Sequence, residues 1–248
     1  MKGYVLKSFK EPLVPAELER PKASPGRVVV RVAAAGVCYR DYLAWQGFQK
    51  LLLVVPGHEF AGVVEEVGDG VSEFKPGDAV AGMIYEFCGE CDYCRTGREY
   101  LCRARKVYGE ALPGIFAEYV SVDHKSLVKM PPGVSFGAAS YAACVLSTVI
   151  RGVKKIGASL GRLVLVTGAG GGVGVHAVQV AKAYGARVMA VTSPQKADYV
   201  AKYADYVIRR RFPMRLRSSA GQTAQLSLWG GLLWSRLYVL STGAARWR

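Results

Sequence analysis

Four of the chain's six cysteines lie in the fifteen-residue segment CGECDYCRTGREYLC, which begins at residue 88 and ends at residue 102. Gaps of two residues let successive thiolates reach one ion, and a fourth cysteine after a short loop completes a closed tetrahedron. Because a closed tetrahedron has no open position for a substrate, the spacing predicts a structural zinc site. Free surface thiols and an iron–sulfur cluster are the alternatives, since thiolates also bind iron. The predicted ligands are Cys88, Cys91, Cys94 and Cys102.

The two remaining cysteines, Cys38 and Cys144, lie on either side of the segment VPGHEFAG, which contains His58 and Glu59. Each cysteine is in an apolar stretch and, taken alone, is typical of a small buried core residue. Together the four side chains are ligand types that suit zinc, and a set of two cysteines and one histidine leaves a fourth position for water or substrate. A catalytic zinc site and a pair of core cysteines are both compatible with this spacing.

A third pattern is the glycine-rich turn GAGGGVG, which follows the apolar run RLVLVT and precedes VGVHAVQVAKAYG. Such a turn between a strand and a helix is typical of dinucleotide binding. Glycine allows the backbone to approach the pyrophosphate, and the helix N-terminus supplies N–H donors. The residues predicted to bind the cofactor are Gly168, Gly170, Gly171, Gly172, Val173 and Gly174.

The end of the next predicted strand, RVMAV, favours one cofactor over the other. An Asp or Glu is expected here when the cofactor is NAD, because it binds the ribose hydroxyls, but this sequence has TSPQK. Thr192, Ser193 and Lys196 can accept a 2′-phosphate without repulsion, so the pattern favours NADP over NAD. The alternative is that Lys196 only begins an exposed helix.

The elements that must position these residues fall into three regions. Residues 1–134 contain short β-type runs separated by Gly and Pro, which predicts a mostly antiparallel, barrel-like domain. Residues 135–208 begin with a helical apolar segment, predicted to be largely buried, and continue as a βαβαβ unit, the first half of a doubly wound parallel sheet. The fold class is therefore α/β plus β, followed by an aberrant basic segment at 209–248.

The net charge of +14 comes mostly from this last region. Eight arginines and no Lys, Asp or Glu follow residue 208, which leaves 25 basic and 19 acidic residues, a charge of +6, before it. The charge therefore does not predict a nucleic-acid-binding face on the body of the chain. A basic nucleic-acid-binding tail is a further alternative, although its Leu and Trp content is unusual for such an arm.

Hydropathy and cysteine usage indicate the cellular compartment of the protein. No uncharged apolar run is long enough for a membrane-spanning helix. The first residues, MKGYVLKSFKEPLVP, have charges and prolines where a signal peptide needs an apolar stretch. We therefore expect a cytoplasmic protein with no membrane partner, in which a tight cysteine cluster binds metal and does not form disulfides.

The motifs GVCYRD, VPGHEFAGVVEEVG, KPGDAV, PPG and VLVTGAGGGVG occur in this order, with the four-cysteine segment among them. Residues 1 to about 208 thereby resemble the zinc-containing medium-chain dehydrogenase/reductase family, and within it the archaeal alcohol dehydrogenase-like proteins and acryloyl-coenzyme A reductases. The resemblance implies a GroES-like β-barrel catalytic domain, an incomplete Rossmann domain and two zinc ions per chain. It also implies hydride transfer between a nicotinamide and a zinc-polarised carbonyl or alcohol.

The resemblance also implies roles for individual residues. Cys38, His58 and Cys144 would bind the catalytic zinc, Glu59 would be a nearby or exchanging ligand, and Asp41 would orient His58. One residue departs from the family pattern: Arg40 stands where alcohol dehydrogenases have the Ser or Thr that begins a proton relay, and arginine does not exchange protons at neutral pH. Arg40 instead favours an anionic substrate such as an enoyl thioester of coenzyme A. The expected small-molecule partner is thus an alcohol or aldehyde, or an enoyl thioester.

The pattern of the family ends near Ile208. The following residues resemble an out-of-frame translation of the second half of the domain, and we expect them to lack regular structure. This favours a C-terminally truncated chain, for which a catalytically silent zinc-binding remnant is an alternative to an active enzyme. No oligomeric state follows from the resemblance, because the family assembles through the part of the sheet that is not recognisable here.

Overall fold

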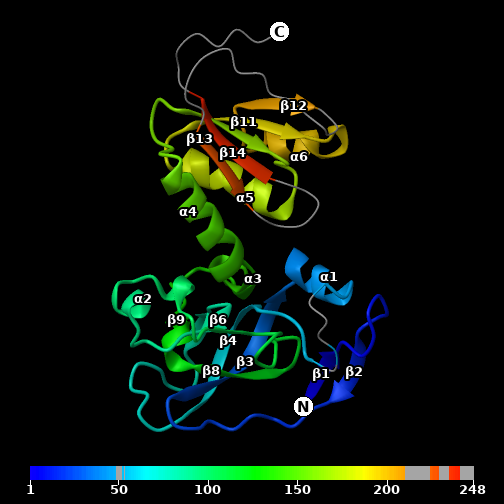
Figure 1. Cartoon of the computed structure of the whole chain (residues 1–248), viewed down its shortest axis with the longest axis vertical. Coiled ribbons are helices and arrows are strands. Elements are labelled where there is room, and N and C mark those ends of the chain that lie inside the picture. Colours follow the sequence, from blue (N-terminus) through cyan, green and yellow to red (C-terminus); the bar gives the residue numbers. More distant parts are fainter. Residues whose placement is uncertain (49–51, 53, 210–223, 229–234, 241–248) are drawn as a thin grey trace. The chain divides into compact units, whose positions relative to one another are not determined.

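The computed structural model describes residues 1–48, 52 and 54–209, and the backbone of residues 224–228 and 235–240 (Figure 1). The chain divides into two compact units, Met1–Cys144 and Val145–Arg248. The division lies ten residues after the boundary drawn from the sequence, so that the segment around Cys144 belongs to the first unit.

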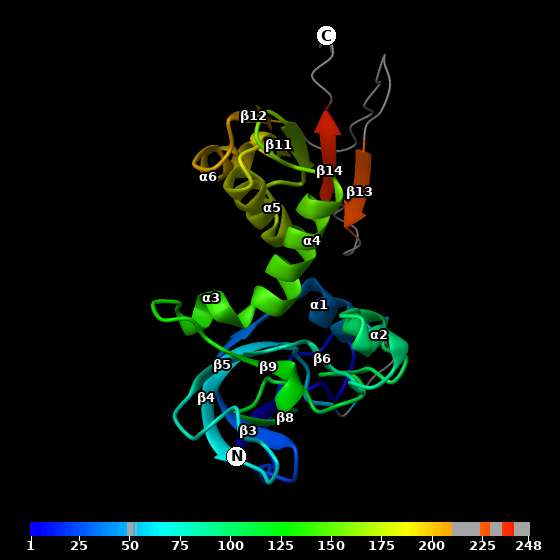
Figure 2. The same ribbon diagram turned by 90° about the vertical axis from the view of Figure 1, so that its left-hand side faces the viewer.

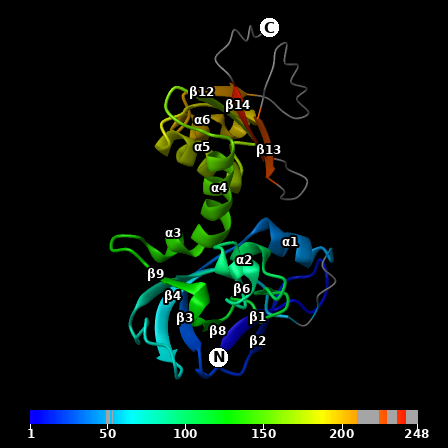
Figure 3. The ribbon, with the colours of Figure 1, turned by 60° about the vertical axis from the view of Figure 1, so that its left-hand side comes forward.

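The first unit is built on an antiparallel sheet whose strand order is β8-β3-β4-β5-β9. The Val-rich sequence of β3 places side chains such as Val28 and Val30 in a fully buried core with Phe60. Register shifts at two points of the β3–β4 pair, consistent with β-bulges, accompany the curvature of these strands in Figures 2 and 3. The strands are β3 (Arg27–Gly36), β4 (Glu59–Val67), β5 (Ala79–Gly82), β8 (Tyr119–Asp123) and β9 (Leu127–Lys129).

Smaller elements complete this unit. Two short antiparallel pairs are formed by β1 (Lys2–Val5) with β2 (Val14–Glu17), and by β6 (Tyr85–Glu86) with β7 (Lys106–Val107). The helical elements are α1 (Tyr39–Trp45), α2 (Asp92–Arg95), η1 (Glu99–Leu101), η2 (His124–Ser126) and α3 (Phe136–Ser140). The predicted antiparallel domain is therefore confirmed.

A polar network ties the short pair β6–β7 to the main sheet. The carboxylate of Glu86 accepts hydrogen bonds from Tyr108 Oη at 2.6 Å and from Arg27 Nη2 at 2.7 Å. Burial raises the pKa of Glu86, but Arg27 and Tyr108 outweigh this effect and hold the pKa below its usual value. Because Tyr108 is almost fully buried, the network fixes the chain just before residues 109–114.

The helix predicted at the start of the second region is interrupted. The structure has α3, a π-helical segment η3 (Ala142–Leu146) and then α4 (Ser147–Lys155). Only Val149, Gly152 and Val153 of α4 are buried, so this helix is amphipathic. The prediction that it would be largely buried is wrong. The extra residue per turn of a π segment shifts the following turns around the helix axis, and such segments are frequent at functional sites.

The second unit has the predicted βαβαβ order. The strands β10, β11 and β12 are parallel neighbours, and the helices α4, α5 and α6 share one apolar core with β10 and β11. The elements are β10 (Leu163–Thr167), α5 (Gly172–Ala183), β11 (Arg187–Thr192), η4 (Pro194–Lys196), α6 (Ala197–Ala201) and β12 (Tyr206–Arg209). The predicted fold class of this region, a partial doubly wound parallel sheet, is confirmed.

Two further strands, β13 (Ala224–Leu228) and β14 (Ser235–Leu240), lie in the region that we expected to lack regular structure. That expectation is wrong for these residues, because β14 pairs antiparallel with β10 and β13 pairs antiparallel with β14. The open edge of β10 offers backbone donors and acceptors to any extended segment, whatever its side-chain pattern. The remaining residues after 209 lie outside the described part of the chain.

Among the described residues, the structure has no helix that is both long enough and apolar enough to cross a bilayer.

Candidate functional site

The first candidate site lies where β3 ends and β4 begins. Gly36, the last residue of β3, pairs with Glu59, the first residue of β4, so the residues after one and before the other lie at the same end of the sheet. Cys38 follows as the N-cap of α1, with an extended backbone (φ −84°, ψ 152°). His58 precedes Glu59 directly. Sheet register therefore brings Cys38 and His58 together from positions twenty residues apart.

The fourth member comes from much later in the chain. Cys144 lies in the π-helical segment η3, and its Sγ is 3.9 Å from Sγ of Cys38. One ligand atom from each of Cys38, His58, Glu59 and Cys144 lies within 4.8 Å of the other three. All four residues belong to the first unit. The structure thus brings these four side chains together. Their separation in the sequence had left a shared metal site and a pair of core cysteines as alternatives.

The chemistry of this group fits a metal ion. His58 and Glu59 are buried, and His58 Nε2 and Glu59 Oε1 have no hydrogen-bond partner among the described residues. Buried polar atoms are normally paired, so two such atoms beside two thiols need an explanation. A cation held by thiolate, imidazole and carboxylate would satisfy them at once, and the donor set of soft and borderline ligands suits zinc.

Asp41 holds two of these residues in place. Its Oδ2 accepts a hydrogen bond from the backbone N–H of Cys38 at 2.8 Å, and its Oδ1 lies 3.4 Å from Nδ1 of His58. A carboxylate on Nδ1 directs the other ring nitrogen, Nε2, toward a ligand. The sequence-predicted orienting residue is therefore in contact with both the Cys38 backbone and the imidazole.

The ionisable side chains of this group lie so close together that each shifts the pKa of its neighbours. Its neighbour Cys144 lowers the pKa of Cys38 to about 4, aided by His58. Burial lowers the pKa of His58, but interactions with Asp41 and Cys38 outweigh it and raise the pKa to about 10. Burial raises the pKa of Glu59 to about 7, and a hydrogen bond with Cys38, together with burial, raises the pKa of Cys144. A proton on His58 thus balances the thiolate when no metal does.

Arg40, the second residue of α1, forms an ion pair with Glu110. Its Nε donates to Glu110 Oε1 at 2.5 Å, and Nη2 contacts the same oxygen. Glu110, together with the thiols of Cys38 and Cys144, raises the pKa of Arg40. The guanidinium is therefore close enough to the metal-ligand group to interact electrostatically with its two sulfur atoms.

The four-cysteine segment forms a second group with converging ligand atoms. Sγ of Cys88 lies 3.6 Å from Sγ of Cys102 and 3.8 Å from Sγ of Cys94, and Cys91 and Cys94 are 3.5 Å apart. The short helices α2 and η1 place these residues, and backbone N–H groups of Glu90 and Cys91 lower the pKa of Cys88 to about 6. Four sulfur atoms at these distances fit one tetrahedral ion with no open position.

The glycine-rich turn lies between β10 and α5 in the second unit. Gly168 has φ 65°, a conformation that other residues rarely adopt. A Cβ on Gly174 would lie 2.1 Å from the carbonyl oxygen of Gly168, so only glycine allows α5 to start this close to the strand. Gly171 is the N-cap of α5, and the other predicted residues, Gly170, Gly172 and Val173, complete the turn and the first helical residues.

The residues predicted to select NADP lie next to this turn. A Cβ on Gly170 would lie 2.5 Å from Thr192 Oγ1 and 2.7 Å from Lys196 Cβ, so both side chains contact the backbone of the turn. Thr192 is buried at the end of β11, Ser193 is the N-cap of η4, and Lys196 is exposed. The structure thus brings Thr192 and Lys196 beside the pyrophosphate-type turn.

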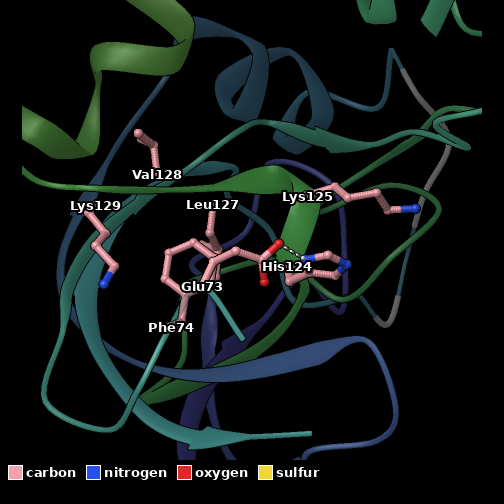
Figure 4. Close-up of a pocket in the computed structure, with 7 residues that line it drawn as sticks. All are labelled: Glu73, Phe74, His124, Lys125, Leu127, Val128 and Lys129. Atoms are coloured by element: carbon pink, nitrogen blue, oxygen red, sulfur yellow. Dashed lines mark ion pairs between the residues drawn. The ribbon is translucent and has the colours of Figure 1, made fainter. Parts of the chain in front are cut away.

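A separate surface pocket in the first unit contains none of the predicted residues. There His124 Nδ1 lies 3.3 Å from Glu73 Oε1, and Lys125 and Lys129 border the pocket on either side (Figure 4). Lys129 pairs with Asp78 at 2.8 Å. Glu73, Lys125 and Lys129 are exposed, as is typical of a solvated surface.

Sequence reasoning missed two residues of the first site. Gly36 leaves room for Glu59, because a Cβ there would lie 2.3 Å from Glu59 Oε2. Glu110 neutralises Arg40 across seventy positions of sequence. A signal for Gly36 was its place two residues before Cys38; Glu110 has no sequence signal beyond its glycine- and proline-rich surroundings, YGEALPG.

The comparisons with known proteins agree with this architecture. The family model for the alcohol dehydrogenase GroES-like domain matches residues 24–132. An acryloyl-coenzyme A reductase of Metallosphaera sedula is 47% identical over 211 residues, which cover 84% of this chain and 64% of that protein. An alcohol dehydrogenase of Geobacillus stearothermophilus is 41% identical over 214 residues, which cover 84% of this chain and 63% of that protein. The chain thus spans less than two thirds of the length of these relatives.

Solved structures give the same result. An NAD-dependent alcohol dehydrogenase is similar with a TM-score of 0.81 and 35% identity, over 86% of this chain and 64% of that one. A cobalt- and zinc-bound thermostable alcohol dehydrogenase from Pyrobaculum aerophilum has a TM-score of 0.77 and 32% identity, over 84% of this chain and 64% of that one. Both likenesses extend well beyond the residues of the GroES-like domain model.

Proposed function

Because this chain belongs to the zinc-containing medium-chain dehydrogenase/reductase family, of the alcohol dehydrogenase type, we propose that it is a zinc-dependent NADP(H) oxidoreductase acting on an alcohol or carbonyl substrate. The observation that supports this most is the convergence of Cys38, His58, Glu59 and Cys144, with two buried polar atoms otherwise unsatisfied.

In this proposal Cys38, His58 and Cys144 hold the catalytic zinc, and Glu59 is a nearby or exchanging ligand. When bound, zinc supplies a Lewis acid that polarises the carbonyl oxygen of the substrate. Asp41 keeps Nδ1 of His58 engaged so that Nε2 is left to serve as a ligand. Cys88, Cys91, Cys94 and Cys102 hold a second, structural zinc that stabilises a loop with little core of its own.

The second unit supplies cofactor binding. The turn from Gly168 to Gly174 would receive the pyrophosphate, with N–H donors and the positive end of the α5 dipole directed at it. Thr192, Ser193 and Lys196 would accept the 2′-phosphate of NADP, and the position of Thr192 and Lys196 against Gly170 supports this. We place the chain in a reducing compartment such as the cytoplasm, where its six free cysteines would stay reduced.

A second candidate, an enoyl thioester reductase, is favoured by Arg40. The residue does not relay protons at neutral pH, and its positive charge suits an anionic substrate such as acryloyl-coenzyme A. The similarity to an acryloyl-coenzyme A reductase supports this candidate, and the similarity to alcohol dehydrogenases supports the first.

The test is a titration of the purified, zinc-loaded chain with NADPH, followed by cofactor fluorescence, and then by assays with aldehydes and with crotonyl-coenzyme A. Saturable binding of one NADPH per chain and turnover of either substrate is the expected result. Turnover of aldehydes alone selects the first candidate, and turnover of the thioester alone selects the second. Absence of NADPH binding at millimolar cofactor would contradict both and favour a catalytically silent zinc-binding protein.

A further inference from the structure

The ion pair between Arg40 and Glu110 is asymmetric in a way that bears on substrate choice. Both contacts of the guanidinium, from Nε and from Nη2, end on one carboxylate oxygen, Oε1. A guanidinium has five N–H donors in a planar fork and commonly binds a carboxylate through two parallel hydrogen bonds to two oxygens. Within the described part of the chain, Nη1 of Arg40 has no hydrogen-bond partner. Arg40 therefore keeps donor capacity for a second anionic group.

Each partner lies next to a segment that carries a proposed metal ligand. Arg40 follows Cys38 by two residues on α1. Glu110 lies in a tight turn closed by a hydrogen bond from Gly109 N to Leu112 O, at 2.9 Å. A Cβ on Gly109 would lie 3.0 Å from the backbone nitrogen of Gly57, the residue before His58.

The turn with Glu110 is also fixed from its other side. The chain enters it from the buried Tyr108, which is held by Glu86, and leaves it with a hydrogen bond from Ile115 N to Gly57 O at 3.2 Å. Glu110 is thus positioned against the His58 loop by backbone contacts, and its carboxylate meets the guanidinium that follows Cys38.

The exposure of the pair suits a binding role better than a stabilising one. The side chain of Arg40 is 47% exposed and that of Glu110 is 23% exposed. Ion pairs at this exposure contribute little to folding stability, since water screens the charges and both side chains lose conformational freedom. The same exposure leaves the guanidinium reachable from solvent, close to the sulfur atoms of the proposed catalytic site.

Resting on the proposed function, we propose that Glu110 is a specificity-determining residue that acts as an internal competitor for Arg40. Arg40 binds the carboxylate or phosphate of an anionic carbonyl substrate, and Glu110 must be displaced from it or share it. A neutral alcohol or aldehyde makes no such exchange, so Glu110 does not affect its binding. The substrate class is a carbonyl compound that carries an anionic oxygen group.

The inference is tested by ligand binding to the full chain in which cobalt(II) replaces zinc. Ligands perturb the absorption of cobalt at an open site, whereas the closed four-cysteine site should not respond. The probes are butanal, 4-oxobutanoate, which has a carboxylate in place of the terminal methyl group, and crotonyl-coenzyme A, which carries phosphates. Comparing the last two distinguishes a carboxylate from a phosphate source.

The variants are Glu110→Gln, Arg40→Gln and, as a matched control, Glu65→Gln. Glu65 is also a carboxylate paired with arginines, Arg20 at 3.3 Å and Arg31 at 3.7 Å. It is six residues along β4 from Glu59, about 20 Å away at the rise of an extended strand. Its substitution changes the net charge equally but leaves Arg40 alone.

We expect Glu110→Gln to tighten the binding of at least one anionic probe by about tenfold, the effect of removing one competing charged hydrogen bond. Butanal binding should change less than about twofold, Glu65→Gln should leave all three probes unchanged, and Arg40→Gln should weaken the anionic probe. If Glu110→Gln shifts butanal and the anionic probes equally, or shifts none, the inference is overturned while the proposed function stands. If none of the three probes perturbs the cobalt spectrum of the unmodified chain, the proposed function fails and this inference fails with it.

Discussion

The carboxylate of Asp41 lies 3.4 Å from Nδ1 of His58 and at the same time accepts the backbone N–H of Cys38 at 2.8 Å. One side chain thus sets the position of both an imidazole and a thiol of the proposed catalytic site. We expect Asp41→Asn to keep the hydrogen bond to Cys38 but to lose the charge that faces His58. The affinity of this site for zinc should fall by about 10- to 100-fold.

Competition with a chelating dye measures this loss, because the dye reports the free zinc. Asp69→Asn is the control, since it removes an aspartate charge from a turn remote in sequence from every ligand. Equal zinc affinities in Asp41→Asn and the unmodified chain would show that Asp41 does not act on His58.

Zinc binding at this site should depend steeply on pH. The thiol of Cys38, with a pKa of about 4, is already ionised at neutral pH, whereas His58, with a pKa of about 10, and Cys144, whose pKa is raised, still carry protons. The metal displaces these two protons, so the apparent affinity rises with pH until His58 titrates. Between pH 7 and pH 8 it should rise by about 100-fold, a factor of ten for each proton released. An affinity that is flat over this interval would contradict the assignment of the two protons.

The choice between the two nicotinamide cofactors should depend on Lys196. Its Cβ and Cδ lie against Gly170, and its charge is the only one among the three residues predicted to accept the 2′-phosphate. We expect Lys196→Ala to weaken NADPH binding by about tenfold, from the loss of a charge-assisted hydrogen bond, and to leave NADH binding unchanged. Lys202→Ala, an exposed lysine beyond the end of α6, is the control. Equal losses for both cofactors in Lys196→Ala would argue against recognition of the phosphate.

Because of Asp205, the free energy of unfolding of the second unit should fall as the pH is lowered. It accepts hydrogen bonds from Lys182 Nζ and from the backbone N–H of Val188, both at 2.6 Å. Burial raises its pKa, but these two donors outweigh burial and lower it. The stabilisation is therefore present above the pKa of the unfolded chain, about 3.9, and is lost as the pH falls through the lower folded value.

At pH 7, Asp205→Asn should lower the free energy of unfolding by about 1 kcal/mol, a value limited by the partial exposure of the pair with Lys182. The difference from the unmodified chain should vanish near pH 2, where the side chain of Asp205 is protonated and, like that of Asn, carries no charge. Asp198→Asn, which breaks an exposed pair with Arg209, should change stability by less than about 0.5 kcal/mol. Urea denaturation at both pH values measures the effect, and a difference that persists in acid would contradict it.

The sequence predicted local features well because their causes are local. The spacing of Cys88, Cys91, Cys94 and Cys102 already limits how far their thiols can separate, and in the structure their sulfur atoms lie within 4.8 Å of one another. The turn from Gly168 to Gly174 is likewise specified by residues that neighbour one another. The conformation of this turn leaves no room for a Cβ atom at its key positions, so only glycine allows it.

Relations between distant residues were not predictable in this way. Cys144 meets Cys38 through a π-helical segment, and neither the interruption of that helix nor its register follows from the apolar pattern. Glu110 meets Arg40 because its turn packs on Gly57, a backbone contact that side-chain types do not indicate. The pairing of β14 with β10 depends on backbone hydrogen bonds, which hydrophobic periodicity does not report.

The proposed function requires two metal sites of different kinds in this chain. Native mass spectrometry of the purified full chain counts bound zinc directly, and we expect two ions in the unmodified chain and one in each of His58→Ala and Cys94→Ser. Loss of the ion should lower the melting temperature strongly only in Cys94→Ser, because the four-cysteine segment has little other core. One zinc ion in the unmodified chain, or two in His58→Ala, would contradict the proposed catalytic site.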